Sequence, residues 1–498
     1  MALIIQVHWP TLVIYRQRIY TGNQLGCAGL EPPHDRPLNP HQGVKTLIGN
    51  PKKAIFKLAW PMMFAMSIQT IYNLVDAFWV SGLGSNALSA VGFFFPFFFM
   101  LMALATGIGT GGGAAISRRI GAKDKAGADS VASHTIVFSV LISIAMMIPF
   151  LIFARPMFQA IGAGETLNDT VAYSQILFSG TIIIFFANVA NALLRGEGDA
   201  KRAMSAMMLG GIINIILDPI MIYTMDLGVA GAAWATLISL SVSSVLLFYW
   251  LFMKKNTYVD FHFRKFKFDR VVTKDIFSVG LPASVQQLSM SINMLILNII
   301  IVGIGGTDGV AVLTTGWRIS TLGIMPLLGI ATAVVSVCGA TFGMRKYRRM
   351  EIALNYSIKI GLIIEIAVAA AIFILAVPIT AVFTQSEGAK QIAPDLIRYF
   401  QITWLFLPGV ALGMLSSSMF QGVGKGMNAL AVTILRTVVL TPPLAYIFAV
   451  TLGMGLDGVW WGLVVANITG SLVSYAWARN YIKKLKKRPQ TLKNEMTI

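Results

Sequence analysis

The sequence predicts an all-α polytopic membrane protein with twelve transmembrane helices, arranged as two six-helix lobes that repeat in parallel. Three observations predict this fold. Hydrophobic residues make up 56% of the 498 positions, charged residues only 12%, and the mean hydropathy is +0.72, whereas soluble proteins carry about 25% charged residues. Apolar segments of membrane-crossing length recur along the chain, and the second half repeats the first. The composition excludes a mainly soluble protein.

The membrane-spanning segments follow one another from residue 55 to residue 481. Crossing a bilayer requires about 20 predominantly apolar residues in a helix. The segments that meet this length lie at about 55–82, 87–112, 131–154, 166–194, 203–225, 229–253, 274–304, 309–338, 354–384, 393–420, 427–451 and 457–481.

The amino-terminal residues do not share this character. Within residues 1–44, no apolar run reaches the length of a span, and the small-residue cleavage site of a signal peptide is absent. We expect a disordered or non-native extension there. The remaining predicted parts are an N-lobe (45–255), a cytoplasmic linker (256–273), a C-lobe (274–482) and a basic cytoplasmic tail (483–498).

Basic residues gather in every second connection between spans. Examples are residues 118–125, 195–202, 254–274 and 345–349, whereas the alternate connections are neutral or acidic. Lysine and arginine are enriched in cytoplasmic loops of membrane proteins. The pattern therefore predicts a cell-membrane protein with both termini in the cytoplasm. It also accounts for the net charge of +18 without a nucleic-acid partner.

The second half of the chain repeats the first. Residues 61–84 align without a gap on residues 282–305, and residues 195–199 align on 421–425. Because each half contains an even number of spans, the two copies have the same orientation. Such duplication is common in secondary transporters, where the transport path lies between the halves.

Polar residues form a stripe within the first span. Gln69, Tyr72, Asn73 and Asp76 fall at helical spacings that share one face. A carboxylate within a membrane is costly unless it has a function or a partner, so Asp76 marks a candidate functional site. In the repeat alignment it is matched by Leu297, so this chemistry belongs to the first half only.

A second buried acid, Asp218, lies in the fifth span. It and Asp76 are each roughly 10 Å from the predicted outer surface, which allows them to share a pocket. Asn214 lies one turn from Asp218, and Thr236 lies at a comparable depth in the sixth span. Carboxylate, amide and hydroxyl oxygens suit a hard cation, and two close carboxylates tend to share a proton. The site can therefore hold Na⁺ or H⁺, and the sequence does not choose between them.

Structural roles for these residues stay open. Asp218 precedes Pro219 and could cap a break in the helix. Asn214 and Thr236, taken singly, could be hydrogen-bonding residues between packed helices.

Other polar residues in the spans suggest cavity-lining or structural roles. Tyr173 could reach the same pocket, and Asn188 and Asn191 could line a cavity nearer the cytoplasm. In the second half, we expect Glu365 to form a helix-joining ion pair with Arg318 or Arg436.

Taken together, these motifs resemble the multidrug and toxic compound extrusion (MATE) transporters. The resemblance covers about residues 45–482 and is closest to the prokaryotic DinF-like branch, because the acids are confined to the first half. It implies an antiporter in which H⁺ or Na⁺ entry drives the export of bulky amphipathic or cationic drugs. It also implies a cation site of Asp76, Asn214, Asp218 and Thr236, and a gating kink at Pro61.

Two other functions were weighed. A flippase for lipid-linked saccharides would use a related fold but needs cationic groups in its cavity. A membrane enzyme would need a metal cluster or a catalytic motif, and the sequence shows neither a His-rich cluster nor a GxSxG motif. A receptor or channel would leave the duplication unexplained. We therefore expect no enzyme activity and no cofactor beyond the coupling ion, with drugs and membrane lipid as partners of a monomer.

Overall fold

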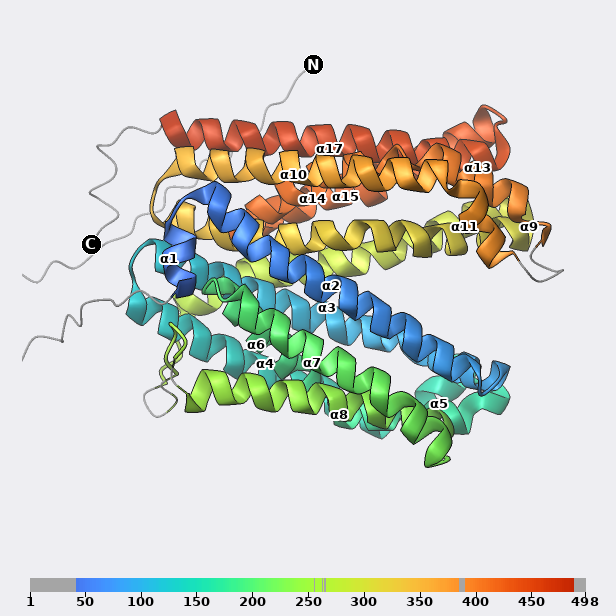
Figure 1. The fold of residues 1–498 in the computed structure, drawn as a ribbon, viewed down its shortest axis with the longest axis horizontal. Coiled ribbons are helices and arrows are strands. Elements are labelled where there is room, and N and C mark those ends of the chain that lie inside the picture. The colour runs from blue at the N-terminus through green and yellow to red at the C-terminus, as the bar shows by residue number, and fades with distance from the viewer. Residues whose placement is uncertain (1–41, 255, 262, 264–265, 385–389, 488–498) are drawn as a thin grey trace, which may run out of the picture. The chain divides into compact units, whose positions relative to one another are not determined.

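In the computed structural model, every regular element of the described residues is a helix (Figure 1). The structure describes residues 42–254, 256–261, 263, 266–384 and 390–487. The elements are α1 (Gln42–Ile48), α2 (Pro51–Ser81), α3 (Ser85–Gly121), α4 (Lys125–Ala160), η1 (Gly164–Thr166), α5 (Leu167–Ser179), α6 (Thr181–Gly196), α7 (Ala200–Pro219), η2 (Ile220–Thr224), α8 (Gly228–Phe248), η3 (Tyr249–Met253), α9 (Arg270–Gly343), α10 (Tyr347–Ile374), α11 (Ala376–Phe383), α13 (Ala393–Thr403), α14 (Phe406–Gly422), α15 (Gly426–Ile434), η5 (Leu435–Leu440), α16 (Thr441–Tyr446), η6 (Ile447–Thr451) and α17 (Gly455–Lys487).

The helices confirm the predicted polytopic membrane fold. Among the described residues, nine helices are long and apolar enough to cross a membrane, and two bent pairs raise this number to eleven. The 74 residues of α9 would extend about 110 Å if straight, more than three times the hydrocarbon thickness of about 30 Å. Its backbone leaves the helical region at Gly306, where φ is 59° and ψ is −150°. α9 therefore contains two spans, which gives the predicted twelve.

The observed helices extend beyond the predicted spans. For example, α3 covers 85–121 where hydropathy predicted 87–112, and α4 begins at Lys125 rather than at 131. Hydropathy detects only the apolar part of a helix, whereas the backbone hydrogen bonds continue into the polar ends. For the same reason, α17 reaches Lys487, five residues into the predicted tail.

The boundaries of the predicted terminal extension and linker also shift. α1 begins at Gln42, so the last three residues of the predicted extension are helical, while residues 1–41 lie outside the described residues. The linker prediction ended at 273, but α9 begins at Arg270 because the Asp269 side chain accepts hydrogen bonds from the Val271 and Val272 amides. The lobe boundaries otherwise stay a prediction, and residues 488–498 of the tail lie outside the described part of the chain.

The two halves meet at the end of the helices that carries the basic connections (residues 118–125, 195–202 and 345–349), which we call the basic end. There α3 packs against α9, and glycines allow the backbones to approach closely. A Cβ at Gly111 would lie 2.3 Å from the Ile276 carbonyl oxygen, and one at Gly121 would lie 2.0 Å from that of Ala340.

Polar contacts also join the halves at the basic end. Arg118 of α3 forms an ion pair with Asp275 of α9 at 2.7 Å, and it donates a second hydrogen bond to the Gly422 carbonyl at 3.0 Å. Ser336 donates to the Arg195 carbonyl at 2.9 Å. The basic end is therefore closed in this structure.

Candidate functional site

Asp218 lies at the end of α7, fully buried, beside two of its predicted partners. Asn214, one turn earlier, donates a hydrogen bond from Nδ2 to Asp218 Oδ1 at 3.0 Å. The same Nδ2 lies 3.5 Å from Thr236 Oγ1 of α8. The structure thus places Asn214 between Asp218 and Thr236.

Asp76 approaches this group from α2. α2 packs against α7, and Gly211 of α7 leaves room for the Tyr72 ring, because a Cβ there would lie 3.0 Å from Tyr72 Cδ1. Asp76 and Asp218 are close enough for their charges to interact. The two acids, from spans far apart in the sequence, therefore share one region.

Three oxygens in this region are buried and have no hydrogen-bond partner among the described residues. They belong to Asp76 (Oδ1), Asn214 (Oδ1) and Asp218 (Oδ2). Buried polar atoms are normally hydrogen-bonded, so unpartnered acceptors gathered in one place fit a proton or a small cation. No group of three or more His, Cys, Asp or Glu side chains suited to a metal ion occurs in the described part of the chain.

The alternative structural role of Asp218, as a cap, is not supported. After Pro219 the chain continues into the π-helical turn η2. The hydrogen bond recorded for the Asp218 carboxylate comes from Asn214 rather than from a backbone group freed by the proline.

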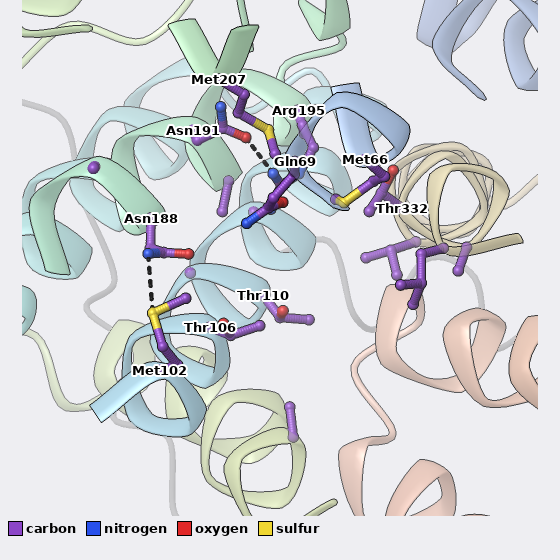
Figure 2. A pocket seen from close by; sticks show the side chains of 18 of the residues that line it. Met66, Gln69, Met102, Thr106, Thr110, Asn188, Asn191, Arg195, Met207 and Thr332 are labelled. Atoms are coloured by element: carbon purple, nitrogen blue, oxygen red, sulfur yellow. Dashed lines mark hydrogen bonds between the residues drawn. The ribbon is translucent and has the colours of Figure 1, made fainter. Parts of the chain in front are cut away.

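A cavity of about 490 Å³ lies between the two halves (Figure 2). Six predicted residues line it, namely Gln69, Tyr72, Asn188, Asn191, Asn214 and Thr236. The carboxylates of Asp76 and Asp218 are not part of this wall. Asn214 and Thr236 therefore separate the acidic site from the cavity while touching both.

Two predicted cavity residues lie elsewhere. Asn73 is exposed and does not line the cavity, because it is adjacent in sequence to Tyr72 and so points about 100° away around α2. Tyr173 is buried, with its ring 5.3 Å from that of Phe94. It is close enough to Asp76 and Asp218 to interact with their charges, so it adjoins the acidic site rather than the cavity.

The two α6 asparagines line the cavity but are engaged by the protein. Asn191 donates to the Ala203 carbonyl at 2.8 Å and accepts from Arg195. Asn188 donates to the Ile184 carbonyl at 3.2 Å and lies 3.7 Å from Met102 Sδ (Figure 2). Asn191 has little remaining capacity to contact a ligand.

Sequence reasoning missed much of the cavity wall. Figure 2 shows methionines and threonines around Gln69, and those labelled are Met66, Met102, Thr106, Thr110, Met207 and Thr332. The spacing of Thr106 and Thr110, four residues apart in a glycine-rich segment, was the available signal. Met side chains adapt to irregular apolar ligands, so the wall combines adaptable apolar surface with scattered hydroxyls.

The predicted second-half ion pair is wrong. Glu365 is fully buried, and neither of its carboxylate oxygens has a partner among the described residues. Arg318 is exposed, whereas Arg436 is buried and lines the cavity. Sequence depth alone placed these groups at similar levels but could not show which faces of their helices they occupy.

Pro61, predicted as a gating kink, lies inside α2, which is helical from Pro51 to Ser81. It is buried, next to the site where Gly329 of α9 approaches Met63, whose amide nitrogen would lie 2.5 Å from a Cβ at Gly329. The helix therefore continues through the proline in this state.

The fold and the site define a polytopic membrane transporter built from two repeated halves. The family model MatE matches residues 61–220 and again residues 282–447, so the chain belongs to the MatE family. The two matches begin at the same prolines that the internal alignment paired.

Relatives and solved structures agree with this assignment. The chain is 29% identical over 419 residues to "Multidrug export protein MepA" of Staphylococcus aureus (strain bovine RF122 / ET3-1), covering 83% of this chain and 90% of that protein. It is 48% identical, with a TM-score of 0.87, to a structure titled as the outward-facing conformation of a multidrug resistance MATE family transporter, covering 90% and 99% of the two chains. A MOP superfamily transporter from Pyrococcus furiosus Vc1 (DSM3638), whose title describes a binding pocket of reverse polarity and suggests a different function, is 49% identical over the same shares with a TM-score of 0.87.

Proposed function

We propose that this protein is an antiporter that exports bulky amphipathic or cationic compounds in exchange for H⁺ or Na⁺. One observation carries the proposal: Asn214 lines the central cavity and also donates a hydrogen bond to Asp218. A cation or proton bound between Asp76 and Asp218 would compete for the Asn214 and Thr236 groups that a substrate would contact. The multidrug export named for its relatives supports the substrate class.

We further propose that transport proceeds by alternating access between the two halves. The closed basic end, held by Arg118 and Asp275, supports an outward-facing state if the basic connections are cytoplasmic. Coupling requires that the ion and the substrate prefer different states, because a ligand shifts an equilibrium only by its difference in affinity. The buried Pro61 in α2 would let this helix bend between states, since proline removes one helical hydrogen bond.

The proposal includes a setting for this activity. The protein would work as a monomer in the cell membrane, with both ends in the cytoplasm, and it would need no cofactor beyond the coupling ion. Both described ends lie at the basic end, where Lys486 of α17 pairs with Glu351 of α10 and α1 packs against α2 and α3.

The test is ethidium efflux from proteoliposomes under a Na⁺ gradient or a pH gradient, each imposed separately. One gradient should drive efflux in the wild type, and Asp218→Asn should abolish it. Asp308→Asn is the matched control, because that acid lies outside the site and accepts a hydrogen bond from Gln391. Driven efflux that survives Asp218→Asn would overturn the proposal.

A further inference from the structure

The fixed charge on the cavity wall is positive. Of the described residues that line the cavity, only Arg195 and Arg436 are charged, and no carboxylate joins them. The acids of the first half lie behind Asn214 and Thr236. A ligand in the cavity would therefore meet guanidinium groups rather than carboxylates.

The two arginines differ in their partners. Arg195 donates to Asn191 Oδ1, which places it in the hydrogen-bond network of α6. Arg436, in the π-helical turn η5, is only 8% exposed, and its Nη1 has no hydrogen-bond partner. In the described part of the chain, no carboxylate lies within 4.0 Å of its guanidinium nitrogens. Arg436 is thus the cavity-facing cation with unused donor capacity.

Two neighbouring helices make room for this side chain. A Cβ at Gly413 of α14 would lie 2.6 Å from Arg436 Nη1, and a Cβ at Gly470 of α17 would lie 2.9 Å from Arg436 Cβ. The same Cβ at Gly413 would lie 2.6 Å from Ser471 Oγ, a second buried group without a partner. An unpartnered guanidinium and an unpartnered hydroxyl therefore adjoin one glycine-lined space.

The polar groups next to this space are already satisfied. Gln286 donates to Ser417 Oγ at 2.8 Å and to Thr433 Oγ1 at 2.6 Å, and it accepts from Gln421 at 2.8 Å. This network fixes the wall beside Arg436 without using the guanidinium. A ligand is then the remaining source of a partner.

We propose that Arg436 binds an anionic group, a carboxylate or a phosphate, on an amphipathic compound carried in the central cavity. A buried charge without a counter-charge is costly, and an arriving oxyanion offsets that cost with charge-assisted hydrogen bonds. Ser471 supplies a further hydroxyl donor. This inference rests on the proposed transport function and narrows its substrates to compounds that pair an apolar body with a negative group.

The same chemistry could come from an anionic phospholipid of the bilayer. The position of Arg436 on the wall between the halves, rather than on a lipid-facing surface, favours the transported compound. The lipid becomes an outcome of the test.

The experiment compares two dyes that differ only at one carboxyl group: rhodamine 19, the free acid, and rhodamine 6G, its ethyl ester. Their affinities for the full-length protein are measured by fluorescence anisotropy in neutral phosphatidylcholine nanodiscs. We expect the wild type to bind the free acid about tenfold more tightly than the ester, as a charge-assisted hydrogen bond would give. Arg436→Gln should remove this preference, and Arg436→Lys should retain part of it. The control is Arg318→Gln, at an exposed arginine outside the cavity wall, and it should keep the full preference.

Each outcome decides the proposal. Equal affinities in the wild type would overturn it even if the Arg436 variants fail to fold, and so would a preference that survives Arg436→Gln. Loss of the preference when phosphatidylglycerol replaces phosphatidylcholine would assign the site to a lipid phosphate and overturn the substrate inference. Transport of rhodamine 6G without any preference for the acid would leave the exporter standing while this inference falls. An Arg436-dependent preference without transport of either dye would uphold the anion site and contradict the proposed function.

Discussion

Asn214 donates its Nδ2 hydrogen bond to one oxygen of Asp218, at 3.0 Å, while the other oxygen of that carboxylate has no partner. The amide group therefore holds the carboxylate in place without satisfying it. Because Asn214 also lines the cavity, it is the residue through which events at the acidic site can reach a bound compound.

Replacing Asn214 should weaken the ion site directly. Asn214→Leu removes a hydrogen bond to a charged acceptor, which contributes about 1.5–3 kcal/mol, so the half-saturating concentration of the driving ion should change by about tenfold or more. The measurement is transport rate against the concentration of that ion in proteoliposomes. Ser241→Ala is the control, since its hydroxyl bonds only the Leu237 carbonyl of its own helix. An unchanged ion dependence in Asn214→Leu would remove this residue from the site.

The Arg118–Asp275 ion pair should stabilise the state that is closed at the basic end. Its side chains are 10% and 27% exposed, and Asp275→Asn should cost about 1 kcal/mol, a shift of about fivefold toward the open state. Spin labels placed on the two halves at the basic end would report longer distances by pulsed EPR. Lys486→Gln, which breaks an ion pair within the second half, should leave the distribution as it is. A lack of change in Asp275→Asn would show that glycine packing alone holds this end closed.

The sequence predicted the helical architecture well, because long apolar segments, basic connections and the internal repeat are local signals. It also brought Asp76 and Asp218 together by depth, although they lie on different helices. It did not predict Arg436 as a cavity residue, because depth along a helix does not give the rotation of that helix. Asn73 shows the same limit, since the polar stripe of α2 is wide enough for one edge to point away from the cavity.

The closeness of the two halves was also hidden from the sequence. The glycines of α3 were visible as a run, but only the packing shows that Gly111 faces a backbone carbonyl of α9 while Gly92 of the same helix faces open space. Tertiary partners, rather than local composition, decide what a glycine does.

Glu197 should make stability depend on pH. It follows α6, is buried, and accepts hydrogen bonds from the Tyr258 and Val259 amides at 2.9 and 3.2 Å. Burial raises the pKa of this carboxyl to about 8. Since its folded pKa lies above the unfolded value of about 4.3, the stabilisation is complete at low pH and is lost as the pH rises through about 8.

The wild type should therefore unfold at a lower temperature near pH 9 than near pH 6, by up to about 1.4 kcal/mol per pH unit in between. Glu197→Gln keeps an acceptor for the two amides but cannot ionise, so its unfolding temperature should be nearly flat over this range. Thermal unfolding followed by tryptophan fluorescence checks the difference. A variant as sensitive to pH as the wild type would assign the dependence to another group.

Two glycine substitutions in α3 should act in opposite directions. Gly111→Ala would place a Cβ 2.3 Å from the Ile276 carbonyl oxygen, and separating α3 from α9 should cost about 1–3 kcal/mol. Gly92→Ala meets nothing within 4 Å and should be neutral or stabilising by up to about 1 kcal/mol. Thermal unfolding of both variants in the same detergent compares them. Equal destabilisation would contradict the close approach of the two helices.

Exchange itself is the central claim, and ion flux driven by the exported compound measures it most directly. Proteoliposomes with an imposed ethidium gradient and no ion gradient would be monitored for counterflow with a luminal pH dye and with radioactive sodium. The account predicts that ethidium movement drives one of the two ions in the opposite direction, and that Asp76→Asn abolishes this flux. Ethidium movement without counterflow of either ion would contradict it.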